Sequence, residues 1–160
     1  MNYTILLDTP VGDLMLAADQ VGLRHLHFLR SPTHTLTPPT DWQHNDRPFK
    51  DAVRQLKAYF AGKRTQFDLP LAPEGTDFQR RVWNALQTIP YGQTASYGTI
   101  ARTIGNAAAS RAVGMANGRN PIAIIIPCHR IIGSNGKLVG FGGGLPIKQT
   151  LLSLEQGRGP

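Results

Sequence analysis

Hydrophobic and polar residues alternate at the start of the chain. Residues 3–7 carry a large apolar side chain at every second position, which is typical of a half-buried strand. Residues 10–13 have the composition of a turn, and residues 14–17 and 23–29 are apolar enough for two further strands. The stretch from 31 to 46 is rich in proline, threonine and other polar residues, so it predicts a surface loop.

The spacing of apolar residues then becomes helical. A helix is predicted from residue 49 to residue 60, and Gly62 ends it. Prolines and a glycine between residues 70 and 75 mark a boundary. The helical spacing rests on Phe49, Val53, Leu56 and Phe60.

The remainder of the chain predicts mainly helices. Thr76 or Asp77 can cap the first one, and Ser96 can cap the second. A turn at Gly105 leads to a third helix over residues 107–117, and two short helices joined in this way fit a helix-turn-helix. A buried apolar run (residues 122–126), a glycine-rich stretch (133–144) and a last helix bearing Ile147, Leu151 and Leu154 follow. We therefore expect an α+β protein: a small α/β unit (1–70) followed by a helical domain (71–160).

Charge separates the same two parts. Hydrophobic residues make up 41% and charged residues 17% of the chain, as in an ordinary globular protein. Residues 1–74 have no net charge, so residues 75–160 carry the whole net charge of +7. A basic half favours a polyanionic partner, although charge that merely maintains solubility remains an alternative. With no signal-peptide pattern, no membrane-spanning apolar run and one cysteine, we expect a cytoplasmic protein without a disulfide.

The single cysteine is the candidate centre of chemistry. Cys128 is followed directly by His129 and Arg130, either of which can favour the reactive thiolate. The alternative is an inert, buried cysteine. Only two acids occur in the basic half: Glu155, which could reach back to orient His129, and Asp77, which is better explained as a helix cap.

A metal site is not expected. One cysteine is too few for a recognisable zinc pattern, and the other histidines have no suitable ligands beside them. His25 and His27 fall on one face of a predicted strand, where we expect a solvated pair. The other two histidines of the first half are His34 and His44.

Ordered blocks of sequence surround the cysteine. They read RAVG at 111–114, NGRNP at 117–121 and IPCHRII at 126–132, and they continue through GGL at 143–145 to Glu155. Upstream, FQ, VW and IPYG stand at residues 78–79, 82–83 and 89–92, and Lys148, Leu151 and Leu152 complete the pattern. Over about residues 76–155 the chain thus resembles the O6-alkylguanine-DNA alkyltransferases, also called methylated-DNA–protein-cysteine methyltransferases.

The resemblance implies a self-inactivating repair reaction. Cys128 would accept the alkyl group of O6-alkylguanine irreversibly, and O4-alkylthymine is a further candidate substrate. His129, acting through water and oriented by Glu155, would withdraw the thiol proton. Tyr97 would donate to the leaving guanine, and Asn120 would brace the segment before the cysteine.

The resemblance also implies which residues meet DNA. Arg111 would replace the damaged nucleotide when it is flipped out of the duplex, from a helix lying in the minor groove. Ala112, Gly114, Arg119 and Arg130 would contribute to the DNA contact. The substrate pocket would involve Ile131, Phe141, Gly142 and Lys148.

Three positions depart from the common pattern of that family. Ala123 stands where proline is frequent, Phe141 where tyrosine is frequent, and Gly142 where serine or alanine is usual. Phe141 and Gly142 lack hydrogen-bonding side chains, which puts the preferred alkyl size in question.

The resemblance implies double-stranded DNA as the partner, with no cofactor and no membrane. We expect a monomer, and cooperative binding along DNA remains open. Two other functions are weighed against repair by alkyl transfer. A protein that recognises alkylated DNA without chemistry would not need Cys128, and a small-molecule thiol hydrolase would not need the basic half or Arg111.

Overall fold

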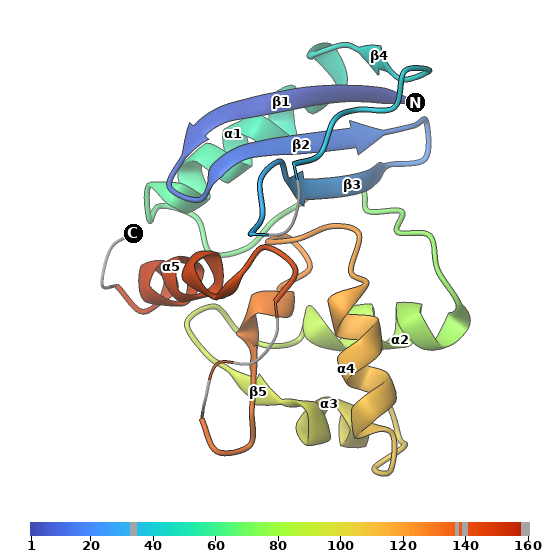
Figure 1. Cartoon of the computed structure of the whole chain (residues 1–160), viewed down its shortest axis with the longest axis vertical. Helices are drawn as coiled ribbons and strands as arrows, with labels where there is room; N and C mark the ends of the chain where they lie inside the picture. Colours follow the sequence, from blue (N-terminus) through green and yellow to red (C-terminus); the bar gives the residue numbers. More distant parts are fainter. Residues whose placement is uncertain (33–34, 137, 139–140, 158–160) are drawn as a thin grey trace.

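A computed structural model describes residues 1–32, 35–136, 138 and 141–157 of the chain. A four-stranded sheet and the helix α1 (Lys50–Phe60) form one part, and the remaining helices form the other (Figure 1). The expected α+β class is confirmed. The boundary near residue 70 lies in an extended connection between α1 and α2 (Asp77–Leu86).

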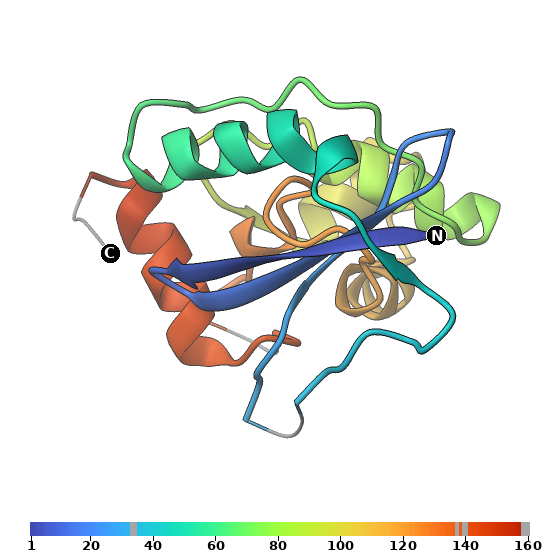
Figure 2. The same ribbon diagram turned by 90° about the horizontal axis from the view of Figure 1, so that it is seen from above.

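The first three strands form an antiparallel meander. They are β1 (Asn2–Thr9), β2 (Gly12–Ala18) and β3 (Leu23–Phe28), and each pairs with the next. Residues 14–18 of the central strand are all buried because both faces of the sheet are covered. The view from above shows α1 along one side of the strands (Figure 2).

The predicted loop over residues 31–46 contains one short strand. There β4 (Gln43–His44) pairs in parallel with β1, which gives the sheet order β3-β2-β1-β4. Backbone hydrogen bonds from Gln43 N to Met1 O (3.0 Å) and from Asn45 N to Tyr3 O (3.0 Å) hold it. A pair of polar residues has no measurable alternation, so the sequence offered no sign of this strand. A 3-10 turn (Arg47–Phe49) then leads into α1.

The predicted helix-turn-helix is present. It comprises α3 (Tyr97–Thr103) and α4 (Ser110–Gly118), with Gly105 at a φ of 81° in the turn between them. The preceding helix, α2, is capped by Thr76, whose hydroxyl accepts from the backbone of Gln79, rather than by Asp77. Trp83 of α2 donates from Nε1 to the carbonyl of Ala116 (2.9 Å), which fixes α4 against α2.

The segment after α4 crosses back to the sheet. Leu26 of β3 donates to Pro121 O (2.9 Å) and accepts from Ala123 N (3.0 Å), so this segment is bonded to the sheet edge. Residues 122–126 are all buried as expected, but they form turns. Ile124 has a φ of 71°, which costs a β-branched residue about 1–3 kcal/mol and persists only where surrounding packing enforces it.

Three short elements complete the helical part. A 3-10 turn, η2 (Cys128–Arg130), precedes β6 (Ile131–Ile132), which pairs in parallel with β5 (Ala95–Ser96). The last helix, α5 (Leu145–Glu155), returns beneath the sheet (Figure 1). Among the described residues, no helix is long and apolar enough to cross a membrane.

The contact between the inter-domain connection and α2 has a measurable consequence. A methyl group at Gly75 would lie 2.5 Å from the ring of Trp83, which is buried and cannot move aside cheaply. We expect Gly75→Ala to lower the free energy of unfolding in urea by about 1–3 kcal/mol. Gly118→Ala is the control, because nothing lies within 4 Å of that position. Equal effects of the two substitutions would contradict the predicted clash.

Candidate active site

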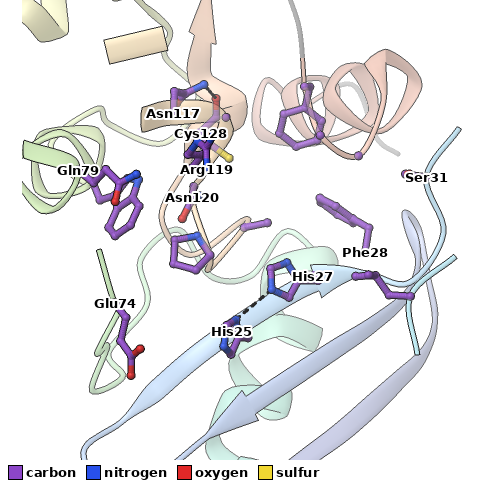
Figure 3. Close-up of a pocket in the computed structure, with 18 residues that line it drawn as sticks. His25, His27, Phe28, Ser31, Glu74, Gln79, Asn117, Arg119, Asn120 and Cys128 are labelled. Atoms are coloured by element: carbon purple, nitrogen blue, oxygen red, sulfur yellow. Dashed lines mark hydrogen bonds between the residues drawn. The ribbon is translucent and has the colours of Figure 1, made fainter. Parts of the chain in front are cut away.

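Cys128 is the first residue of η2 and is 6% exposed. It lines a pocket of about 500 Å³ whose walls come from the C-terminal end of α4, from β3 and from the glycine-rich stretch (Figure 3). Phe141, Gly142, Arg119 and Asn120 line the same pocket. The structure thus brings four of the residues expected at the site to one cavity with the cysteine.

Two asparagines hold the backbone that carries the cysteine. Asn120 donates from Nδ2 to Ile126 O (2.8 Å) and accepts at Oδ1 from Ile122 N (3.0 Å), so it closes the turn between them. Asn117 of α4 donates to the carbonyl of Cys128 at 3.5 Å. These hydrogen bonds are of the kind that the bracing role predicted for Asn120 requires. The contact from Asn117 was not predicted from the sequence.

Glu155, at the end of α5, is a buried carboxylate. His129 Nε2 lies 2.6 Å from its Oε2, and Arg130 Nε donates to its Oε1 at 2.7 Å. Tyr59 of α1 donates its hydroxyl to Oε2 at 2.6 Å. Burial opposes ionisation of this carboxyl, but the donors outweigh burial and hold the pKa of Glu155 at about 2. The group is therefore charged at neutral pH.

This charge determines how His129 can act. The ring is fully buried, and burial lowers the pKa of His129 even though Glu155 opposes that change. A neutral imidazole beside an ionised carboxylate must carry its proton on Nε2, which leaves Nδ1 with its lone pair. Nδ1 has no hydrogen-bond partner among the described residues. His129 can thus serve as a base through Nδ1.

The cysteine needs such a base. Burial raises the pKa of the Cys128 thiol, and a hydrogen bond with Asn120 and the charge of Lys148 only partly offset this effect. The thiol is therefore protonated at neutral pH and becomes a strong nucleophile only when its proton is removed.

Two expected site residues lie away from the pocket wall. They are Lys148 and Ile131, and both are fully buried. Lys148 donates from Nζ to the backbone carbonyl of Ile131. Lys148 thus bonds the backbone of β6, the strand to which Ile131 belongs. Lys148 can influence Cys128 through its charge, but neither side chain forms a surface for a substrate.

The expectation that Arg130 contacts DNA is wrong. Its side chain is 8% exposed, and its donors bond Glu155 and the carbonyl of Ile89 (2.7 Å). A guanidinium that is buried, with its donors directed at partners inside the protein, is not presented to a phosphate on the surface. The sequence could not show this because Glu155 is 25 residues away.

A shallow groove runs beside α4. Tyr97, Arg111 and Gly114 line it together with Phe141 and Gly142, which also line the cysteine pocket. Arg111 and Ala112 are exposed, and the Tyr97 ring packs against Gly114. Burial, together with the nearby cysteine, raises the pKa of Tyr97, so its hydroxyl stays protonated.

The first-half histidines differ from expectation. His25 and His27 are half-buried, lie 3.1 Å apart between Nδ1 and Nε2, and line the far side of the cysteine pocket (Figure 3). They are therefore not simply solvated. His34 lies outside the described residues. In the part of the chain that the structure covers, no cluster of three or more His, Cys, Asp or Glu could hold a metal ion.

Two family models match nearly the whole chain. Residues 2–73 match the ribonuclease-like domain of 6-O-methylguanine DNA methyltransferase, and residues 77–157 match its DNA binding domain.

Individual relatives agree with these matches. The chain is 54% identical to a methylated-DNA–protein-cysteine methyltransferase of Methanosarcina acetivorans, over 96% of this chain and 97% of the relative. It is 56% identical to the protein of the same name from Mycolicibacterium paratuberculosis, over 96% and 92%. The crystal structure of Mycobacterium tuberculosis OGT in complex with DNA superposes with a TM-score of 0.91 at 52% identity, covering 100% of this chain and 96% of that one.

The buried carboxylate predicts a specific pH dependence of stability. Glu155→Gln leaves Arg130 without its counter-charge, so it should cost about 3 kcal/mol of unfolding free energy at pH 7. The folded-state pKa of about 2 lies below the ordinary 4.5. The stability from Glu155 is therefore complete above pH 4.5 and is lost as the pH falls towards 2. Urea unfolding of both proteins should show their difference shrinking across that range.

The exposed acid Glu74 provides the control. Glu74→Gln should change the free energy of unfolding little at any pH, since the Glu74 side chain is 74% exposed. A difference between wild type and Glu155→Gln that stayed constant from pH 7 to pH 2 would contradict the assignment.

Proposed function

The chain belongs to the 6-O-methylguanine DNA methyltransferase family and is a methylated-DNA–protein-cysteine methyltransferase, and we propose that it transfers the alkyl group of O6-alkylguanine in duplex DNA irreversibly to Sγ of Cys128. The observation that carries the proposal is that a buried thiol with a raised pKa directly precedes a histidine with a lowered pKa, whose Nδ1 has no hydrogen-bond partner among the described residues. No other cysteine is present to accept the group.

The reaction requires one proton removal and one proton delivery. His129 takes the thiol proton through a bridging water, and Glu155 stabilises the resulting imidazolium. The sulfur then attacks the alkyl carbon, a carbon–sulfur bond forms, and the carbon–oxygen bond breaks with its electron pair remaining on O6 of guanine. The Tyr97 hydroxyl donates a hydrogen bond that stabilises the leaving guanine. The guanine anion takes up one proton from water, and the His129 imidazolium returns the thiol proton to water, so that charge and protons balance.

The product explains why the protein would act once. A thioether offers no good leaving group, so nothing at the site can return Cys128 to a thiol. The proposed reaction needs no cofactor. O4-alkylthymine presents a similar alkyl–oxygen bond and is the second substrate that we propose to test.

The groove beside α4 is the proposed DNA surface. Arg111 lines the groove and is exposed, and its neighbour Ala112 is exposed as well. The basic half of the chain supplies the attraction for phosphates. We propose that the Arg111 side chain fills the space left by the flipped nucleotide. We also propose that Arg119, which lines the cysteine pocket, contacts the DNA strand. The related protein from Mycobacterium tuberculosis was solved with DNA, which supports the transfer of this role. We propose that the chain acts as a monomer.

Intact-mass measurement tests the transfer itself. After incubation with an O6-methylguanine oligonucleotide, the protein should gain the mass of one methyl group, and peptide mapping should place it on Cys128. Cys128→Ala should bind the oligonucleotide and gain no mass. Tight binding with an unchanged wild-type mass would instead identify a protein that recognises damage without chemistry.

Comparison of two substrates tests the role of Arg111. Arg111→Ala should slow transfer from duplex DNA by a factor of about ten or more, because unstacking a base costs a few kcal/mol, yet it should leave transfer from the free base unchanged. Arg80→Ala is the charge-matched control, since Arg80 is exposed on α2 outside the groove. Equal slowing of the two substrates would remove Arg111 from nucleotide flipping.

A further inference from the structure

We propose that Tyr59 of the N-terminal part is a positioning residue for alkyl transfer: its hydroxyl fixes the carboxylate oxygen of Glu155 that orients His129. The inference rests on the proposed function, in which His129 is the base. It gives the N-terminal part a role in positioning the groups that transfer the proton.

The contact joins two ends of the chain. Tyr59 lies in α1 and Glu155 is the last residue of α5, 96 residues later. The hydroxyl donates to Oε2 at 2.6 Å, and His129 Nε2 lies 2.6 Å from the same oxygen. Arg130 Nη2 also donates to Oε2, at a longer 3.1 Å. The two short contacts of Oε2, with Tyr59 and with His129, therefore define the position of this oxygen.

The position of the Tyr59 ring is itself fixed. The ring is fully buried, and its centroid lies 5.3 Å from that of Phe60, 5.5 Å from that of Phe67 and 6.1 Å from that of Tyr91. Gln55, one turn earlier in α1, exchanges two hydrogen bonds with the backbone of Asp68, which holds the loop that carries Phe67. An aromatic ring enclosed in this way presents its hydroxyl in one direction.

Tyr59 acts as a donor only. Burial raises the pKa of Tyr59, and the charge of Glu155 raises it further, so the hydroxyl keeps its proton at neutral pH. The other groups that face Glu155 are His129, Arg130 and the amide of Gly92. Tyr91 interacts with the charge of Glu155 without a hydrogen bond, and the charge of Lys148 acts on His129. Of these donors, Tyr59 alone comes from the N-terminal part.

Loss of this hydroxyl should change the base as well as its position. With one donor fewer, the Glu155 carboxylate attracts the His129 imidazolium more strongly, so the pKa of His129 rises. Because only neutral His129 can accept the thiol proton, the low-pH limb of the rate profile moves to higher pH. A lost hydrogen bond to a charged group corresponds to a shift of about one pH unit.

The test uses the full chain carrying Tyr59→Phe. Single-turnover transfer from an O6-methylguanine oligonucleotide is measured from pH 5 to pH 9 beside the wild type. We expect transfer about tenfold slower at pH 7, with the low-pH limb raised by about one unit. NMR titration of the His129 ring should show the same upward shift in its pKa without any DNA present.

Leu56→Val provides the control for loosened packing. Leu56 is fully buried in the same helix and offers no polar group, so its substitution should lower stability without moving the rate profile. An unmoved profile for folded Tyr59→Phe would overturn the proposal, and so would an equal movement for Leu56→Val. If the wild type takes up no methyl group, the proposed function fails, and the His129 titration alone then decides whether Tyr59 tunes that residue.

Discussion

The structure depends on one buried negative charge. Removing a carboxylate from water costs several kcal/mol unless donors replace the lost hydration, and Glu155 meets that requirement with His129, Arg130 and Tyr59. These donors come from α1 and from η2, so Glu155 links α5 to both parts of the chain. The contacts of Glu155 thus attach α5 to the rest of the protein and orient the His129 ring. They also leave Nδ1 as the ring nitrogen that can accept a proton.

The same arrangement keeps the nucleophile inactive at rest. Burial raises the pKa of the Cys128 thiol, and a protonated thiol reacts slowly with chance electrophiles. In the proposed reaction each molecule acts once, so a slowly reacting thiol would avoid loss of the protein to stray alkylation. Under the proposed mechanism, reactivity is confined to a substrate held in line with Sγ while His129 withdraws the proton. The hydrogen bonds of Asn120 hold the backbone segment that leads to the thiol.

The sequence predicted the parts of the fold that repeat locally. Alternation identified β1 to β3, helical spacing identified α1, α2 and α5, and the turn at Gly105 identified the helix-turn-helix, because each pattern follows from short-range geometry. It could not predict β4, which is defined only by its pairing with β1. At the site, adjacency suggested His129 and scarcity of acids suggested Glu155. Arg130 was misassigned and Tyr59 was missed, because both are defined by contacts with a residue far along the chain.

The central claim is that Glu155 holds His129 as a neutral base with its proton on Nε2. Nitrogen-15 NMR of the imidazole rings at pH 7 tests this directly, with the His129 signals identified by their loss in His129→Gln. The account predicts a neutral ring, protonated at Nε2 and unprotonated at Nδ1. A ring that is doubly protonated at pH 7, or that carries its proton on Nδ1, would contradict it.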